Sequence, residues 1–250
     1  MVAVDNLSLQ LYTVRHKLEE DFDATLARIA EIGFTKVEPF GVPGIADQLA
    51  EALPKHGLSA PTTHAGLLRD EDAAPIYAAA QKLGISTVIE PFIDPARWQS
   101  ADDVKATAEA LNQASVEAAK HGITVGYHNH HFELESKIDG VHALEIFVDH
   151  LNDDVVLELD TYWAAVGGAD VPALLKKWGS RVVALHVKDG DGTLDNKAQT
   201  AVGDGTIAVA DILAAAPQAL RVVELDDFSG EIFDAVEGSF KFLTGEGAPA

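Results

Sequence analysis

Short apolar runs alternate with amphipathic stretches along the whole chain. In four places a helical stretch ends in glycine and an apolar run follows at once, in the segments EIGFTKVE, KHGLSAPTTH, KLGISTVIE and KHGITVGYH. Glycine supplies the left-handed cap that ends a helix, and a short apolar run after it predicts a strand. The recurring join therefore predicts repeated helix–strand units.

The same patterns extend over the full length. Strands are predicted to start near residues 7, 36, 59, 86, 123, 155, 182 and 222, and helices near 21–32, 45–56, 71–83, 101–121, 140–151, 170–178, 208–216 and 231–242. The spacing of roughly 31 residues is typical of one βα unit. No G-x-G-x-x-G turn follows any strand, so a (β/α)8 TIM barrel of the α/β class, one domain over residues 1–250, is favoured over an open doubly wound sheet.

Alternation within the strands separates an aliphatic face from a polar one. In VVLELD, Glu158 and Asp160 oppose the aliphatic residues; His186 and Lys188 do so in VVALHVK, and Glu224 and Asp226 in VVELD. The helices of a barrel cover the aliphatic face, so the polar face is expected to point inward. Gln10, Glu38, His64 and Glu90 are assigned to the same inward set. These positions predict one pocket at the carboxyl ends of the strands.

Charged side chains in such a pocket need a partner that offsets their desolvation. Asp160, His186 and Glu224 come from three successive strands, and two carboxylates with an imidazole suit a divalent ion, with Mn²⁺ favoured and Mg²⁺, Co²⁺ or Zn²⁺ as alternatives. A fourth ligand is expected from GYHNHHFE. Alternation places His128 inward and Glu133 on the other face, whereas a bend after the strand would return Glu133 to the pocket. The residues alone leave this choice open.

Several segments, in order and at barrel spacing, resemble a known family. LSLQLYTVR, GYHNHHFE, LELDTYWAAVGG, ALHVKD, VGDGTI and VVELD are similar to the xylose-isomerase-like barrels, which include sugar phosphate isomerases and epimerases, ketose 3-epimerases, inosose dehydratases, 3-keto-glycoside lyases and, more distantly, endonuclease IV. The resemblance implies that Glu133, Asp160, His186 and Glu224 hold one metal ion. Trp163 and Gly192 stand where the ketose epimerases have His and Arg, so the epimerase substrate does not transfer directly.

The resemblance also implies a mechanism. The ion would polarise a sugar ketone, a glutamate would remove the neighbouring proton, and an enediolate would form. Glu133 and Glu224 are expected as base and acid, Lys188 as a group that stabilises the oxyanion, and His128 or His130 as a proton donor to a leaving oxygen. The residues expected to bind substrate are Gln10, Glu38, His64 and Trp163.

Returning the proton gives an isomerase or epimerase, which is the leading expectation. Expelling a β-substituent gives the alternative, a lyase or dehydratase acting on a keto-sugar or a 3-keto-glycoside, such as a C-glycoside deglycosidase. A sugar-binding barrel without catalysis and an endonuclease IV-like hydrolase are less favoured. In VGDGT, Thr206 is interpreted as a helix N-cap, in preference to a phosphate cradle.

Composition narrows the partners. With 40 acidic and 18 basic residues the formal charge is −22, which disfavours nucleic acid as a ligand. The chain has no cysteine, so disulfides and thiolate ligands are excluded. Nothing resembles a signal peptide or a membrane span, which predicts a soluble, cytoplasmic protein. The resemblance implies a small sugar or keto-sugar as the substrate, and we expect an oligomer with identical or different subunits. The sequence leaves the sugar, the metal and the oligomeric state open.

Overall fold

A computed structural model describes residues 2–69 and 72–245. Eight strands form one sheet in the order β2-β1-β12-β9-β8-β5-β4-β3, with every neighbouring pair parallel. Their bounds are β1 Leu7–Gln10, β2 Val37–Glu38, β3 Thr62–His64, β4 Thr87–Glu90, β5 Thr124–His128, β8 Val156–Asp160, β9 Val182–Val187 and β12 Leu220–Val223. Two isolated parallel bridges, Lys36 to Ser59 and Phe40 to His64, join the segments around β2 and β3. They nearly close the sheet into a barrel.

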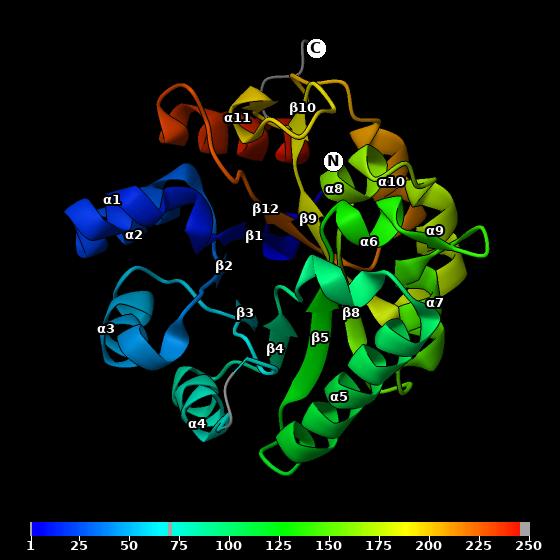
Figure 1. Cartoon of the computed structure of the whole chain (residues 1–250). Coiled ribbons are helices and arrows are strands. Elements are labelled where there is room, and N and C mark those ends of the chain that lie inside the picture. The colour runs from blue at the N-terminus through cyan, green and yellow to red at the C-terminus, as the bar shows by residue number, and fades with distance from the viewer. Residues whose placement is uncertain (1, 70–71, 246–250) are drawn as a thin grey trace.

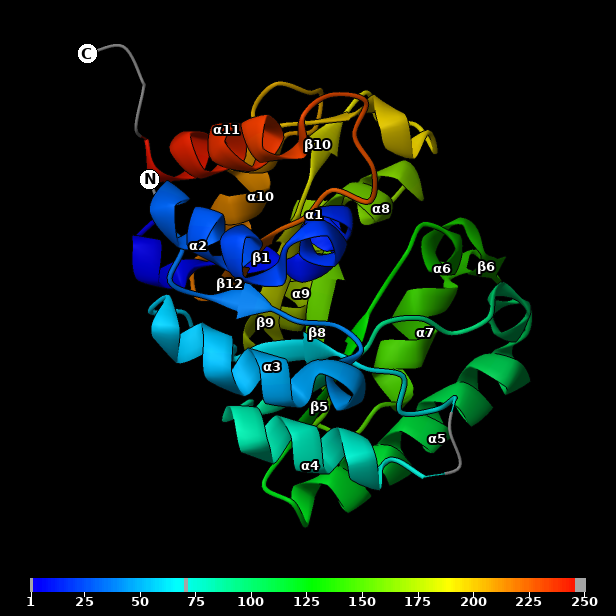
Figure 2. The ribbon, with the colours of Figure 1, turned by 90° about the vertical axis from the view of Figure 1, so that its left-hand side faces the viewer.

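Helices surround the strands on the outside, as Figures 1 and 2 show from two directions. The predicted helices are present as α2 Phe22–Ile32, α3 Val42–Lys55, α4 Ala74–Leu83, α5 Ala101–Ala119, α7 Ala143–His150, α9 Val171–Trp178, α10 Val209–Ala215 and α11 Ile232–Thr244. Three further short helices are α1 Arg15–Glu20, α6 Phe132–Glu135 and α8 Thr161–Val166, and two small hairpins are β6 Lys137–Ile138 with β7 Val141–His142 and β10 Asp189–Gly190 with β11 Gln199–Thr200. The predicted (β/α)8 barrel is confirmed.

Local sequence explains where many of the helices begin and end. The side chains of Asp21 and Ser100 accept hydrogen bonds from the first turns of α2 and α5, and these caps satisfy backbone donors that the helix leaves free. Gly33 and Gly84 follow α2 and α4 in the left-handed conformation, as the recurring glycine join predicts.

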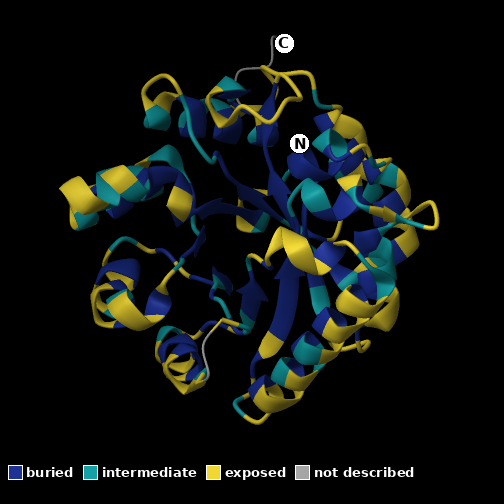
Figure 3. Cartoon of the chain, viewed as in Figure 1, coloured by how far each residue is buried: buried dark blue, intermediate teal, exposed yellow. Residues whose placement is uncertain are grey.

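Most residues of the barrel strands are buried (Figure 3). The two faces of the strands differ in chemistry. Outward residues such as Leu9, Val125 and Leu157 pack under the helices, within one hydrophobic core. Inward residues near the carboxyl ends are polar and fully or almost fully buried, among them Gln10, Glu158 and His186. The barrel interior therefore concentrates polar groups in a place of low solvent access.

The expectation that Glu90 points inward is wrong. Glu90 aligns with Tyr127 across the β4–β5 pair, whereas the neighbouring Ile89 aligns with Gly126 on the inward side. The Glu90 carboxylate accepts backbone hydrogen bonds from Leu68 and Phe92 instead. A buried carboxylate can thus be satisfied by loop N–H groups outside the barrel.

No helix in residues 2–69 and 72–245 has the length and apolar character that a membrane crossing requires.

Candidate active site

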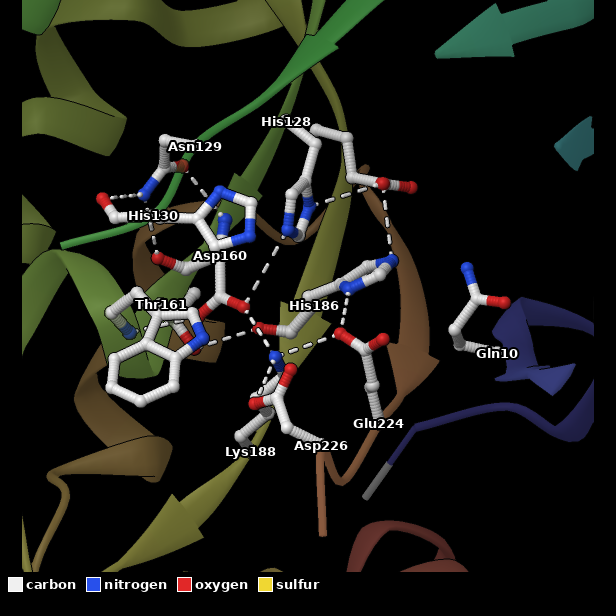
Figure 4. A network of polar contacts seen from close by, with 12 residues as sticks. Gln10, His128, Asn129, His130, Asp160, Thr161, His186, Lys188, Glu224 and Asp226 are labelled. Atoms are coloured by element: carbon white, nitrogen blue, oxygen red, sulfur yellow. Dashed lines mark hydrogen bonds and ion pairs between the residues drawn. The ribbon is translucent and has the colours of Figure 1, made fainter. Parts of the chain in front are cut away.

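Four potential metal ligands meet at the carboxyl ends of four adjacent strands (Figure 4). His128 ends β5, Asp160 ends β8, His186 lies in β9, and Glu224 follows β12. One ligand atom from each lies within 4.8 Å of all the others. His186 Nδ1 lies 2.5 Å from Glu224 Oε2, and His128 Nε2 lies 3.9 Å from Asp160 Oδ2. We call these residues the outer cluster.

Lys188 places its ammonium group beside the outer cluster. Its Nζ lies 2.8 Å from Asp160 Oδ2, 2.8 Å from Glu224 Oε2 and 2.8 Å from Asp226 Oδ2. The side chain is only 1% exposed, so these three carboxylates replace the water that a lysine would otherwise need. Lys188 therefore supplies fixed positive charge within the site.

A second layer of polar groups lies next to the outer cluster. Glu158 Oε2 lies 2.6 Å from His64 Nε2, 3.0 Å from His186 Nε2 and 3.4 Å from His128 Nδ1. Glu38 Oε1 lies 2.8 Å from His186 Nε2 and accepts a hydrogen bond of 2.7 Å from Gln10 Nε2. Thr62 donates its hydroxyl proton to the other oxygen of Glu38. We call Glu38 and Glu158 the inner carboxylates.

Hydrogen bonds fix the end of β8, where Asp160 must be placed. Asp160 Oδ1 accepts from the backbone N–H of Trp163 at 2.8 Å, which makes Asp160 the N-cap of α8. Asn129 accepts from the Asp160 backbone N–H at 2.9 Å, and Thr161 donates its hydroxyl proton to His186 O at 2.9 Å. One oxygen of Asp160 is thus used for structure, and Oδ2 is left for Lys188 and an ion.

Burial and charge give the groups different proton affinities. Burial raises the pKa of Asp160 to about 6, despite the nearby Lys188. Burial also favours protonation of Glu224, but Lys188 and His186 outweigh it and hold that pKa well below its ordinary value. Burial, helped by the charge of Lys188, lowers the pKa of His130 to about 4, so His130 is a neutral imidazole at neutral pH.

The donor set fits a divalent cation. Two carboxylates and two imidazoles on rigid strands are a composition that Mn²⁺, Co²⁺ and Zn²⁺ accept. Asp160 Oδ2 has the Lys188 ion pair but no hydrogen bond, although it is buried. Such an atom has lone pairs to spare for an ion. A second group, made by His64, His128, Glu158 and His186, meets the same distance limit and shares two histidines with the first.

Glu133 lies outside both groups. It belongs to α6, is completely buried, and accepts from the Tyr127 hydroxyl at 2.7 Å and the His130 backbone N–H at 2.9 Å. Burial raises its pKa to about 7. The structure therefore brings Asp160, His186 and Glu224 together as the sequence predicts, and gives the fourth position to His128, which strand alternation favours. Ligation by Glu133 stays a prediction that this placement does not favour.

A cavity of about 560 Å³ opens onto the outer cluster. Its polar floor includes His64, His128, His130, Glu224 and Asp226. Its wall is apolar and aromatic, with Tyr12, Phe40, Pro43, Ile76 and Phe92, and Arg69 lies over the Phe92 ring at 5.3 Å. A mostly apolar pocket with a few convergent polar groups is the usual form of a small-molecule site.

The other predicted site residues fall into two sets. His64 and His130 line the cavity. Gln10 and Glu38 are completely buried and hydrogen-bonded to each other, and Trp163 is 5% exposed beside Lys188, with 5.6 Å from Nζ to the ring centre. None of these three lines the cavity, and neither does Lys188. Substrate contact by Gln10, Glu38 and Trp163 remains a prediction. Their buried positions are better suited to holding the cavity-lining residues in place than to contacting a substrate.

Sequence reasoning gave no role to three groups that the structure makes prominent. Asp226 lines the cavity and is held by Lys188 and by Gln199 Nε2 at 2.7 Å. Glu158 gathers three imidazoles, and Asn129 fixes the end of β8. The inward parity of Glu158 and Asp226 was the available signal, whereas nothing in the sequence distinguishes Asn129.

The VGDGT loop serves a structural purpose. The Asp189 carboxylate accepts from the backbone N–H groups of Gly203 at 3.0 Å and Ile207 at 3.1 Å, as well as from Gly190. These donors are the ones a phosphate cradle would need, and Asp189 occupies them. The N-cap interpretation of Thr206 is wrong, because α10 follows Ala208 and the Thr206 hydroxyl donates to Gly190 O.

Comparison with known proteins places this architecture and site in a family. The model of the xylose isomerase-like TIM barrel family matches residues 26–219, and the chain belongs to that family. A crystal structure of a sugar phosphate isomerase/epimerase from Parabacteroides distasonis superposes with a TM-score of 0.81 and 25% identity, over 96% of this chain and 94% of that one. The IOLI protein, whose crystal structure contains a bound zinc atom, gives a TM-score of 0.74 at 18% identity, over 97% of this chain and 99% of that one, and shows the shared fold.

A curated relative is the inosose dehydratase of Erwinia tasmaniensis, 28% identical over 129 residues. The match spans 50% of this chain and 42% of that protein. The proteins that this chain resembles thus include a sugar phosphate isomerase/epimerase and an inosose dehydratase.

Proposed function

We propose that this protein is a divalent-metal-dependent enzyme that removes a proton next to the carbonyl of a sugar, with isomerisation or epimerisation as the outcome. The observation that carries the proposal is the outer cluster at the floor of the cavity, where two carboxylates and two imidazoles converge. The family supports it, and so does the zinc atom in the IOLI protein, which shares the fold. The cation would be held by His128, Asp160, His186 and Glu224, and when bound it would polarise a carbonyl oxygen.

The residues of the chain can carry the proton. Glu224 Oε2 lies 2.5 Å from His186 Nδ1 and 2.8 Å from Lys188 Nζ, but Oε1 accepts no hydrogen bond from the residues that the structure describes. Since Glu224 lines the cavity and is held ionised by its neighbours, Oε1 is our candidate for the base.

His130 is the candidate for the second proton carrier. It lines the cavity, its Nδ1 has no hydrogen-bond partner, and its low pKa keeps the ring neutral, with one N–H and one lone pair. A neutral imidazole can donate to a sugar oxygen and accept from it in turn. Lys188 forms ion pairs with Asp160 and Glu224, and its positive charge stabilises the negative charge that develops in the site.

Deuterium exchange tests the proposal directly. Protein loaded with Mn²⁺ is incubated in D₂O with a ketohexose, an inosose or a 3-keto-glycoside, and incorporation at carbon is followed by NMR. We expect exchange with at least one of them, and we expect Glu224→Gln to slow it by about 10²–10⁴-fold. Glu51→Gln, on the exposed surface of α3, is the matched control and should exchange at the wild-type rate. A Glu224→Gln variant with only weaker substrate binding would instead indicate a sugar-binding barrel.

One observation favours a second candidate, a lyase or dehydratase. Beyond the polar floor the wall is aromatic, with Tyr12 40% and Phe92 36% exposed and Phe40 5.4 Å from Tyr12 between ring centres. Such a wall would pack against an apolar leaving group attached to the sugar. The same first proton transfer would then break the bond to that group, and the proton taken up by Glu224 would pass to the leaving oxygen while the His130 N–H donates a hydrogen bond to it. Chromatography measures whether the free aglycone is released from a 3-keto-glycoside. Release supports the lyase, whereas deuterium exchange at carbon without release of the aglycone supports the isomerase or epimerase.

A further inference from the structure

The inner carboxylate Glu158 collects three imidazoles on a single oxygen atom. His64 Nε2, His186 Nε2 and His128 Nδ1 lie 2.6, 3.0 and 3.4 Å from Oε2. Glu158 is completely buried and precedes Asp160 by two residues, so both side chains lie on the inward face of β8. A carboxylate can only accept hydrogen bonds, so His64 Nε2, hydrogen-bonded to Glu158, and His186 Nε2, hydrogen-bonded to Glu38, are placed to carry a proton. His128 Nδ1 is buried and has no hydrogen bond, and a proton on it would face Glu158 Oε2.

The opposite nitrogens of the two shared histidines lie on the side of the outer cluster. His186 turns Nδ1 to Glu224 at 2.5 Å, and His128 turns Nε2 towards Asp160 at 3.9 Å. A neutral imidazole has one N–H and one lone pair, and a hydrogen bond on one nitrogen selects the tautomer whose lone pair lies on the other. Protons held on the inner side therefore leave lone pairs on the outer side.

The two groups of potential ligands are not suited to hold one ion each at the same time. His128 and His186 belong to both groups, so with two ions each ring would bridge two cations and keep no N–H proton. Glu38 adds a second acceptor at 2.8 Å from His186 Nε2, and its own position is fixed by Gln10 and Thr62. The inner side is thus built to receive protons, and the outer side to receive a cation.

We propose that Glu158, assisted by Glu38, is a positioning residue that holds the protons of His128 Nδ1 and His186 Nε2 and thereby directs the two opposite lone pairs at one metal ion. This inference rests on the metal site of the proposed function. Hydrogen bonds to the far nitrogen of a metal-bound histidine fix its tautomer and orientation, and removing such a partner typically weakens metal binding by about 10–100-fold. His64, which Glu158 holds in the same way, lines the cavity and is oriented towards the substrate space.

NMR of the wild type provides the first test. Protein labelled with ¹⁵N in histidine is loaded with Zn²⁺, which is diamagnetic, and two-bond ¹H–¹⁵N spectra identify the protonated nitrogen of each ring. Single His→Gln variants assign the signals. We expect His128 protonated at Nδ1 and His186 protonated at Nε2. The opposite tautomer at either ring overturns the inference, and since this measurement needs no Glu158 variant, it does not depend on whether a variant folds.

Zinc affinity provides the second test. We expect Glu158→Leu, which removes the acceptor at similar volume, to bind Zn²⁺ about 10–100-fold more weakly in competition with a chromogenic chelator. Glu158→Gln keeps one acceptor oxygen and should restore part of the loss. The matched control is Glu90→Gln, a buried carboxylate that contacts backbone N–H groups instead of histidine and should keep wild-type affinity and tautomers. If Glu158→Leu keeps the wild-type zinc affinity and histidine tautomers, the inference about Glu158 is wrong but the proposed function stands. If the wild type takes up no zinc, both the inference and the proposed function are wrong.

Discussion

His128 and Glu133 lie close in sequence, yet their side chains end on opposite sides of β5. His128 continues the inward alternation of the strand and reaches the outer cluster. The chain then turns into α6, and Glu133 packs against Tyr127, whose ring contacts Trp98 and Phe147 outside the barrel. Strand geometry thus favours His128 over Glu133 as the fourth ligand of the proposed metal site.

Zinc affinity separates the two residues experimentally. We expect His128→Gln to weaken Zn²⁺ binding by about 10²-fold or more, because a direct ligand should matter at least as much as its hydrogen-bond partner. Glu133→Gln should change the affinity by less than about threefold, because among the described residues its carboxylate accepts hydrogen bonds from Tyr127 and the His130 backbone and from no histidine side chain. Competition with a chelator measures both, and the reverse order would return the fourth position to Glu133.

The burial of Glu133 also predicts a pH dependence of stability. Its pKa is about 7 in the folded protein and near 4.5 in an exposed carboxyl, so the unfolded state releases the proton first as pH rises. The contribution to folding is complete below about pH 4.5 and is lost as pH rises through about 7. Between about pH 5 and pH 8 the wild type should lose about 2 kcal/mol that Glu133→Gln retains.

Urea denaturation of both proteins at the two pH values gives this difference, in which titrations common to both proteins cancel. A constant difference in unfolding free energy between wild type and Glu133→Gln would show that Glu133 is ionised at the lower pH as well.

Strand alternation decides which single residues of the site could be predicted from the sequence. Asp160, His186 and Glu224 could be placed from sequence because their strands alternate cleanly and helices cover the other face. Glu90 could not, because a polar residue at a strand end is compatible with either face until the loop donors of Leu68 and Phe92 are known. Contacts between distant segments supply that information, and one sequence does not contain them explicitly.

At the scale of elements, long periodic segments were predictable and short ones were not. All eight strands and eight of the helices lie near their expected positions, because each has its own apolar face and recognisable residues at its ends. The helices α1, α6 and α8 have four to six residues, too few for a periodic signal. α8 depends on the side chain of Asp160 as its N-cap, so the element and the site are formed together.

The loop after β9 gives a prediction at this scale. A Cβ atom at Gly205 would meet the Asp189 carboxylate and the backbone N and O atoms of Gly190, and backbone atoms cannot move aside cheaply. We expect Gly205→Ala to lower the unfolding free energy by about 1–3 kcal/mol and to reduce turnover, since β11 of this loop carries Gln199, which holds Asp226.

Gly44→Ala is the control for this substitution. Gly44 lies inside α3 with open space around its Cα, so the same change should stabilise the protein by up to about 1 kcal/mol. Urea denaturation measures the two variants side by side. Equal effects in the two would contradict close packing of Gly205 in the loop.

At the scale of the whole molecule, the barrel concentrates negative charge at its centre. The carboxylates Glu38, Glu158, Asp160, Glu224 and Asp226 face one lysine and a group of histidines in a region with little water. Uncompensated buried charge is costly, so the native state has more to gain from a divalent cation than the unfolded chain has.

Metal binding should therefore raise the thermal stability of the protein. An ion that binds only the native state stabilises it by about 2.7 kcal/mol at a free concentration 100 times its dissociation constant, and for a domain of this size that corresponds to a Tm shift of about 5–11 °C. We expect Mn²⁺ or Zn²⁺ to raise the Tm and excess EDTA to reverse the shift. Asp160→Asn should lose most of the response, because Asp160 Oδ2 is a buried carboxylate atom of the outer cluster that has no hydrogen bond. Glu51→Gln, on the surface of α3, should respond as the wild type does. A Tm that neither metal nor chelator changes would show that Lys188 and the histidines balance the charge of the site, and that the barrel interior does not hold a cation.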